Sequence, residues 1–377
     1  MPFSARSGFL FQISGAPPAP GGDPAWNEWT LANALSVAST WTATTSPTTN
    51  TTYSHSDFGS LQYRSAVLHP NGKIYFLPRN STAGVIEFDV SAKTFSTQTY
   101  GLIYPAVAKY HTAILAPNGK IYGIPFSTSN FLVIDPANNY AEFNTFGTSL
   151  TGSVMYSGAA LGTDGKIYAV PQQADKVLVL DPNANTAFEA TYGVTFVGTN
   201  SYIGASIGSD GRIYGAPYDD NAVLVIDPAS NTAIKSTYSS SSHWNTASGF
   251  QGCAMGADGK VYFAKHNATN VSVLDPSSNT SYTLSGAAKS IGAHMGADGN
   301  VYLMPFNQTS VSKIDIYANS ISTFAGSSNY FGGAMGTDGV IYATPDNNTN
   351  LLAIDTKGTG TANANLIISP YINKGSH

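Results

Sequence analysis

The clearest pattern along the chain is a short stretch of small residues, a turn, a second stretch that contains a tyrosine, and two further stretches separated by a polar turn. Asp164-Gly165 joins the first two in one copy, and Asp-Gly is a strong hairpin signal because a type I′ turn needs positive φ at both central positions. No helical periodicity interrupts the pattern. It predicts four short antiparallel strands, which in this copy are residues 157–161, 166–170, 176–180 and 187–192.

The same pattern occurs seven times. Each copy has Asn or Asp, then Gly, one further residue, and then Ile or Val followed by Tyr. The turn glycines are Gly72, Gly119, Gly165, Gly211, Gly259, Gly299 and Gly339. An aspartate follows the glycine by sixteen residues in six copies and by seventeen in the first. These aspartates are Asp89, Asp135, Asp181, Asp227, Asp275, Asp315 and Asp355.

The spacing of the repeat predicts the fold. The turn glycines are 47, 46, 46, 48, 40 and 40 residues apart, a range in which one repeat forms one four-stranded propeller blade. We therefore predict an all-β protein, a seven-bladed β-propeller of four-stranded antiparallel blades with a non-repeat N-terminal extension. Residues 61–368 form the propeller, residues 1–60 an arm or linker for attachment or oligomer contact, and residues 369–377 a tail. The outer strand of the last blade comes either from residues 366–371 or from the arm.

A column of small residues supports this fold. It stands six residues before each turn glycine, where innermost strands converge on one axis. Cys253 belongs to this column, so we interpret it as a small buried residue and not as a reactive thiol. The repeated Ile/Val-Tyr pairs are interpreted as packing within and between blades. The column is Ala66, Ala113, Ala159, Ala205, Cys253, Ala293 and Gly333.

Composition narrows the classes of function. Only 10% of the residues are charged, against about 25% in an average globular protein, so the surface is expected to be polar but nearly uncharged. A net charge of −5 without a basic stripe argues against nucleic-acid binding. One cysteine excludes an intrachain disulfide framework. The start lacks the pattern of a signal peptide, and no run approaches the roughly 18 apolar residues of a membrane span. We expect no membrane insertion.

The loops of the predicted propeller place its candidate binding surface on one face. The turns between the first and second strands and between the third and fourth are short and stereotyped, whereas the loops of the opposite face vary. Aromatic residues stand nine positions before most turn glycines and are expected around the tunnel mouth on this variable face. They either wedge neighbouring blades apart or form an aromatic floor for a sugar or apolar ligand. They are Tyr63, Tyr110, Tyr156, Tyr202, Phe250 and Tyr330, with Ser290 in the remaining copy.

The next position inward offers candidate polar groups. Arg64 and His111 come from adjacent blades and are predicted to face the tunnel mouth as ligand-binding residues. His243, His266 and the pair Asp219 and Asp220 lie on nearby loops. None of these residues has the spacing of a known catalytic or metal-binding motif, so the sequence predicts no catalytic residue, no metal and no cofactor. Seven-bladed lyases of the virginiamycin B lyase type resemble this architecture, but their catalytic set has no matching positions in this chain, and an enzyme remains the alternative.

The two ends of the chain resemble bacteriophage virion proteins. The opening run MPFSARSGFLF, a Pro/Gly segment and then Asp23-Pro24-Ala25-Trp26 are similar to the start of many tailed-phage virion proteins, and the ending SPYINK is similar to theirs. This likeness covers about 35 residues. It implies a non-enzymatic structural protein on the virion surface, made in the host cytoplasm. The aromatic residues expected to anchor the arm are Phe9, Phe11, Trp26 and Trp29.

In this interpretation the arm docks on other virion proteins or on copies of the chain, and the propeller is displayed as a tail fibre or capsid decoration. The propeller then binds the host surface, through a glycan if the aromatic ring is a ligand floor. The competing hypothesis is a cellular propeller in the bacterial periplasm or at the cell surface, acting as a binding module or as a lyase.

Overall fold

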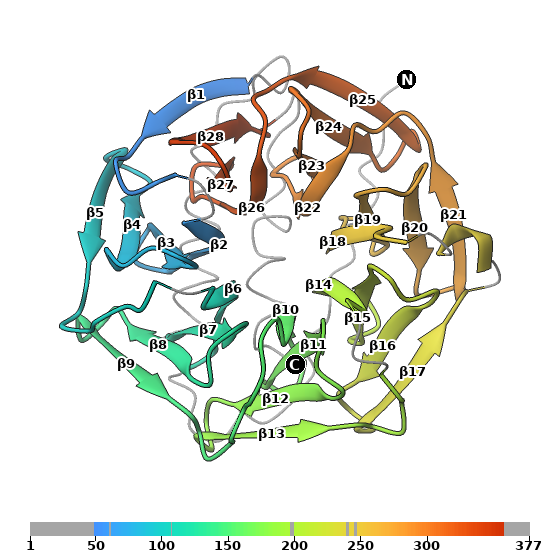
Figure 1. Ribbon diagram of the computed structural model, residues 1–377. Coiled ribbons are helices and arrows are strands. Elements are labelled where there is room, and N and C mark those ends of the chain that lie inside the picture. Colours follow the sequence, from blue (N-terminus) through green and yellow to red (C-terminus); the bar gives the residue numbers. More distant parts are fainter. Residues whose placement is uncertain are drawn as a thin grey trace, which may run out of the picture.

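The computed structural model describes residues 49–59, 62–106, 108–196, 200–238, 241–244 and 247–357. Seven four-stranded antiparallel sheets stand around a central axis like the blades of a propeller (Figure 1). The predicted fold class is confirmed. In the copy of residues 156–190 the predicted strands agree with those observed to within a few residues at each end.

The strands are grouped by their distance from the axis. The innermost are β2 (Tyr63–Leu68), β6 (Tyr110–Leu115), β10 (Tyr156–Leu161), β14 (Tyr202–Ile207), β18 (Phe250–Met255), β22 (Ser290–Met295) and β26 (Tyr330–Met335). The second strands are β3 (Lys73–Pro78), β7 (Ile121–Pro125), β11 (Ile167–Pro171), β15 (Ile213–Pro217), β19 (Val261–Lys265), β23 (Val301–Pro305) and β27 (Val340–Pro345).

The third strands and the outer strands complete each blade. The third strands are β4 (Val85–Asp89), β8 (Phe131–Asp135), β12 (Val177–Asp181), β16 (Val223–Asp227), β20 (Val271–Asp275), β24 (Ser310–Asp315) and β28 (Asn350–Asp355). The outer strands are β5 (Thr94–Gln98), β9 (Tyr140–Asn144), β13 (Thr186–Ala190), β17 (Thr232–Ser236), β21 (Thr280–Leu284), β25 (Ser320–Ala325) and β1 (Thr49–Ser54). A 3-10 turn, η1 (Ser241–His243), lies between β17 and β18.

The ring is closed by the N-terminal segment. Strand β1 pairs antiparallel with β28, so the last blade takes three strands from the end of the repeat region and its outer strand from the start (Figure 1). This settles the source of the closing strand, which the sequence left open. It also corrects the expected boundary at residue 60, because residues 49–54 belong to the propeller and not to the arm. Residues 366–371 lie outside the described residues.

The core lies between the blades. One cluster joins Tyr122 of β7 to Leu161 and Leu178 of the next blade, and the other clusters repeat this arrangement around the ring. The tyrosines three residues after the turn glycines are all at most 1% exposed. The packing role expected for the Ile/Val-Tyr pairs is confirmed.

The turn aspartates are structural. In five blades the Tyr hydroxyl donates to the turn Asp four residues earlier, as Tyr168 does to Asp164 at 2.9 Å. In the first two blades the direction reverses, and the amide of Asn71 donates to the Tyr75 hydroxyl at 2.7 Å. Either residue therefore satisfies the same buried hydroxyl while its Oδ1 accepts from the turn backbone, as Asn71 does from Lys73 and Asp164 from Lys166. This explains why Asn and Asp both occur at this position, and it needs no bound metal.

A waist of glycines narrows the tunnel. A Cβ atom built on Gly158 would lie 2.5 Å from Cα of Gly204, and one on Gly204 would lie 2.4 Å from Cα of Gly252. Neighbouring innermost strands therefore approach so closely that only hydrogen fits between them. The equivalent positions of the first two blades hold Ser65 and Thr112, so the waist is not symmetric.

Candidate functional site

The aromatic residues predicted to ring the tunnel mouth are buried in the core. Each has an exposed fraction of at most 1%. Their polar atoms point into the blades, since the Tyr63 hydroxyl donates to the Gly84 carbonyl and the Tyr156 hydroxyl to Glu189. Their role is the wedge between blades, and the alternative of an exposed aromatic floor is wrong for these side chains. The residues concerned are Tyr63, Tyr110, Tyr156, Tyr202, Phe250 and Tyr330.

In six of the seven blades the residue at the next position does line a cavity at the mouth. The pairing of the innermost and second strands shifts register just after the aromatic, as between Tyr63 and Ser65, where Arg64 is the additional residue. A bulge of this kind releases one side chain from the pleat and re-aims it. The same shift occurs in all seven blades. Six residues of this position line a cavity at the mouth, namely Arg64, His111, Ser157, Ile203, Gln251 and Ile291.

A second ring of lining residues follows the second strands. It stands seven residues after each turn glycine, directly after the residue that ends the strand. These residues lie in the variable loops of the sequence, and apart from His266 none of them was predicted as a site residue. Their equal distance from the turn glycine was the signal that could have identified them. Those that line the cavity are Arg79, Phe126, Gln172, Tyr218, His266 and Phe306, and Asp346 is the seventh member.

These two rings and Asn200 enclose a cavity of about 280 Å³, which we call the mouth cavity. It is near the lower end of the size range of small-molecule sites. Its wall is uneven. Arg64, Arg79 and His111 come from the first two blades, whereas Tyr218, His266 and Phe306 come from the fourth to the sixth.

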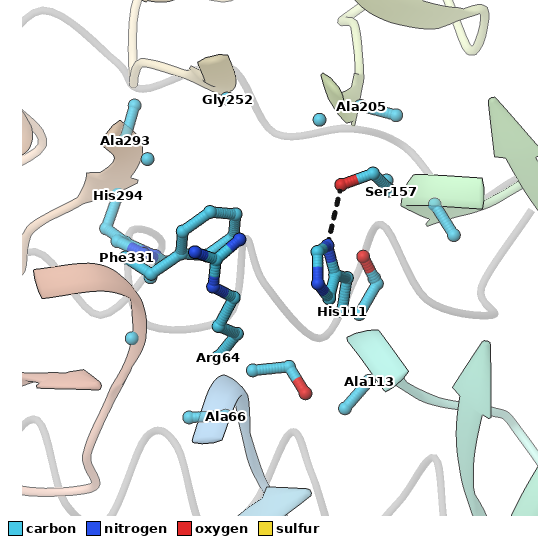
Figure 2. Close-up of a pocket in the computed structure, with 18 of the residues that line it drawn as sticks. Arg64, Ala66, His111, Ala113, Ser157, Ala205, Gly252, Ala293, His294 and Phe331 are labelled. Carbon is cyan, nitrogen blue, oxygen red and sulfur yellow. Dashed lines mark hydrogen bonds between the residues drawn. The ribbon is translucent and has the colours of Figure 1, made fainter. Parts of the chain in front are cut away.

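Arg64 is fixed by a buried carboxylate. Its Nε lies 2.6 Å from Oδ1 of Asp346, and its Nη2 lies 3.4 Å from Oδ2. The guanidinium also stacks on the Phe331 ring, 4.4 Å from the ring centroid (Figure 2). Asp346 is 3% exposed, so the ion pair is partly desolvated, and its two hydrogen bonds hold the Arg64 guanidinium in one position. The carboxylate balances one positive charge of the mouth.

His111 is held on both ring nitrogens. Arg79 Nε donates to its Nε2 at 2.6 Å, which requires the lone pair on Nε2 and the proton on Nδ1. Nδ1 then donates to the Ser157 hydroxyl at 3.1 Å (Figure 2). The ring stacks on Phe126 with centroids 3.4 Å apart. Burial and the charges of Arg64 and Arg79 hold the pKa of His111 well below its ordinary value. His111 is a neutral positioning group for Arg79.

The opposite wall is a row of three aromatic rings. His266 stands between Tyr218 and Phe306, with ring centroids 5.6 Å from each and interplanar angles of 38° and 39°. Its Nδ1 donates to the Ser248 carbonyl at 3.2 Å, which holds the ring in the row. Between the two walls, the Gln172 amide donates to Asn200 Oδ1 at 2.9 Å. The mouth cavity thus has a cationic side, a neutral polar side and an aromatic side.

Below the mouth lies a second hollow of about 200 Å³ at the glycine waist. It is lined mainly by Gly and Ala residues, and His294 is among its side chains (Figure 2). Cys253 also lines it. Cys253 is buried and burial raises the pKa of its thiol, which agrees with its interpretation as a core residue. Nε2 of His294 has no hydrogen-bond partner within the described part of the chain.

His294 makes the stability of the fold depend on pH. Burial lowers its pKa to about 4, below the ordinary value of 6.5. Between these values the unfolded chain binds more protons than the folded one, so the free energy of unfolding falls as pH falls from 6.5 towards 4. We expect His294 to account for a loss of about 2 kcal/mol between pH 7 and pH 5. Urea unfolding of the wild type and of His294→Gln at both pH values measures this loss, and equal losses in the two proteins would contradict it.

The remaining predicted site residues lie elsewhere. His243 binds Ser281 through Nδ1 at 3.0 Å, Asp220 pairs with Lys235 at 2.7 Å, and Asp219 accepts from the Ser248 backbone at 2.7 Å. None of the three is among the residues that line the mouth cavity. The attachment residues Phe9, Phe11, Trp26 and Trp29 lie outside the described residues.

The described residues contain no group of three or more His, Cys, Asp or Glu side chains arranged to hold a metal ion. Within the same ranges, no helix has the length and apolar character needed to cross a membrane.

Comparison with known proteins gives the fold alone. No protein-family model and no curated protein matches the chain. Among solved structures it is similar to a streptogramin B lyase, with 13% identity over 81% of this chain and 96% of that one and a TM-score of 0.65. It is also similar to a catalytically inactive histidine-to-alanine variant of virginiamycin B lyase from Staphylococcus aureus with quinupristin. That match has 11% identity over 81% of this chain and 98% of that one and a TM-score of 0.66. An extracellular domain from B. thetaiotaomicron is similar over 84% of this chain and 43% of that one, at 10% identity and a TM-score of 0.61.

Proposed function

We propose that the chain is a non-catalytic binding module that holds a small ligand in the mouth cavity. One observation carries this proposal. The repeat keeps its packing positions nearly constant from blade to blade, but the two positions that line the mouth cavity differ in almost every blade. Diverse side chains on a rigid repeated scaffold are typical of a recognition surface.

The chemistry of the lining supports binding of a ring-shaped polar molecule. The row of Tyr218, His266 and Phe306 offers flat faces for stacking. Gln172 and Asn200 offer amide groups, and Arg79 offers a cation. A cavity of about 280 Å³ suits one sugar or another single ring.

The state of His111 favours binding over catalysis. A general acid or base needs a nitrogen that faces the substrate and a pKa near the working pH. Both nitrogens of His111 are already bonded within the protein, and its pKa is lowered well below the ordinary value. It is suited to holding Arg79 and not to moving protons.

For the biological setting, we propose display on a bacteriophage virion, with the propeller binding the host surface or decorating the particle. Its support is the resemblance of the two ends of the chain, and both ends lie outside the described residues. In this setting residues 1–48 attach the module to other virion proteins or to copies of itself, and many copies on one particle make weak single sites effective.

A chain that lacks residues 1–46 should stay folded and fail to join the particle. Normal incorporation would contradict the attachment role.

A glycan array, followed by adsorption to host cells, tests the binding role. We expect Tyr218→Ala to lower binding at least tenfold, because it removes one stacking face of the mouth cavity. Tyr317→Ala is the matched control, since Tyr317 is 75% exposed outside the cavity, and it should change binding less than twofold. Equal binding by both folded variants would contradict the proposal. Cleavage of a bound glycan by the wild type would favour the enzyme alternative instead.

A further inference from the structure

Arg79 is a cation without a counter-ion. Its Nε is used by His111, and no described carboxylate lies within ion-pair distance of it. Its Nη1 is buried and has no hydrogen-bond partner among the described residues. A buried guanidinium nitrogen without a partner is costly, because it loses water and gains nothing in return. The site is therefore incomplete as a set of protein groups alone.

The surroundings of Arg79 add positive charge. Burial, and then the positive charge of Arg64, lower the pKa of Arg79 to about 10. The charge of Arg64 is itself balanced by Asp346. Of the two arginines that line this side of the mouth cavity, only Arg64 has a described carboxylate partner.

The position of Arg79 is fixed before any ligand arrives. His111 holds its Nε, and the His111 ring is itself fixed by Ser157 and by stacking on Phe126. Because Nε and Nη1 lie within the protein, the planar guanidinium fork of Arg79 presents Nη2 to the cavity, where its N–H groups can donate to a carboxylate oxygen. Little side-chain entropy is then lost on binding.

We infer that Arg79 is the anion subsite of the mouth cavity and that the ligand is a small carboxylate carried on a six-membered ring. The carboxylate pairs with Arg79, and the ring lies against the row of Tyr218, His266 and Phe306 across the cavity. The inference rests on the proposed binding function and narrows its ligand class. Binding through Arg79 is expected to weaken as salt is added.

Two matched pairs of probes test this inference by calorimetry. D-glucuronate is compared with D-glucose, and benzoate with benzyl alcohol, so that each pair differs in its carboxylate. We expect at least one carboxylate to bind the full chain at least tenfold more tightly than its neutral analogue at low salt. The preferred pair shows whether an acidic sugar or an aromatic acid is the better model of the ligand. Raising NaCl from 20 to 200 mM should weaken carboxylate binding several-fold and leave neutral binding unchanged.

Variants assign the effect to Arg79. In Arg79→Gln the preference for the carboxylate should fall at least fivefold, while in Arg79→Lys it should be partly retained because the charge remains but the fork is lost. Arg212→Gln is the control, since Arg212 lies at the opposite turns beside Asp210 and Asp227 and should leave the preference unchanged. Thermal melting shows that each variant is folded.

Three results would overturn the inference: equal affinity for carboxylates and neutral analogues, an unchanged preference in Arg79→Gln, or no binding of any of the four probes. These results leave the wider binding proposal to be judged by the glycan array, where loss of binding in Tyr218→Ala still supports it. If neither the calorimetry nor the glycan array gives the expected result, both the proposed binding function and the proposed ligand class are contradicted.

Discussion

Removal of residues 1–56 should destabilise the whole propeller, whereas removal of residues 1–46 should leave its stability unchanged. The longer deletion removes β1, which supplies the outer strand of the last blade. It exposes the edge of β28 and removes Tyr53, whose ring packs against Phe88 of the first blade and Tyr342 of the last at 5.4 and 6.3 Å. Loss of this ladder and packing should cost at least about 5 kcal/mol.

Melting of the two truncated chains measures this difference. A loss of that size corresponds to a fall in Tm of roughly 10 °C or more, or to loss of a cooperative transition. The shorter deletion is the matched control, because it removes most of the N-terminal segment but keeps β1. Equal melting of the two chains would show that β1 does not close the ring.

The second large effect concerns the glycine waist. Gly158→Ala should prevent folding or cost more than about 4 kcal/mol, because the new Cβ would lie 2.5 Å from Cα of Gly204 in the next blade. The neighbouring atoms belong to backbone, so the clash is relieved only if two blades move apart. Such a movement would disturb the inter-blade core on both sides.

Gly193→Ala provides the control for this prediction. Gly193 has a φ of +80°, but a Cβ there would meet nothing within 4 Å. Its substitution should cost only about 1–2 kcal/mol, from the left-handed backbone. Urea unfolding compares the two variants. A smaller loss in Gly158→Ala than in Gly193→Ala would mean that the waist is looser than the structure shows.

The repeat made the fold predictable. Turn chemistry at the Asn/Asp-Gly pairs and the even spacing of the copies are local features, so blade number and strand order could be read from the chain. Closure could not be predicted in the same way. Pairing of β1 with β28 joins residues about 300 positions apart. The six other outer strands each begin five residues after a repeat aspartate, and β1 does not.

The candidate site was predicted in part. The column that holds Arg64 and His111 was correctly placed at the mouth, because its spacing from the turn glycine fixes its height in the blade. The tyrosines one residue earlier were placed at the mouth as well, and the burial of Tyr110 at 1% exposure shows instead that they pack between blades. A one-residue bulge just after the tyrosine turns the side chains of the two columns in different directions. No sequence pattern indicated this bulge.

The pairing of Arg79 with His111 could not be foreseen from sequence either. The two residues are 32 positions apart and come from different blades, and their contact depends on how closely those blades pack. The same holds for Arg64 and Asp346, which are 282 positions apart and meet only because the ring closes. These side-chain contacts at the mouth therefore form only when the blades are packed into the closed ring.

Methyl NMR of the isoleucine residues tests most directly whether a ligand enters the mouth cavity. Ile203 and Ile291 line the cavity, whereas Ile103 and Ile234 are 90% and 55% exposed and are not among its lining residues. The probes are D-galactose, D-glucuronate, N-acetylneuraminate and benzoate. The account predicts saturable shifts of the Ile203 and Ile291 methyl signals with at least one probe and unchanged signals of Ile103 and Ile234. Shifts confined to Ile103 or Ile234, or no shift with any probe, would contradict it.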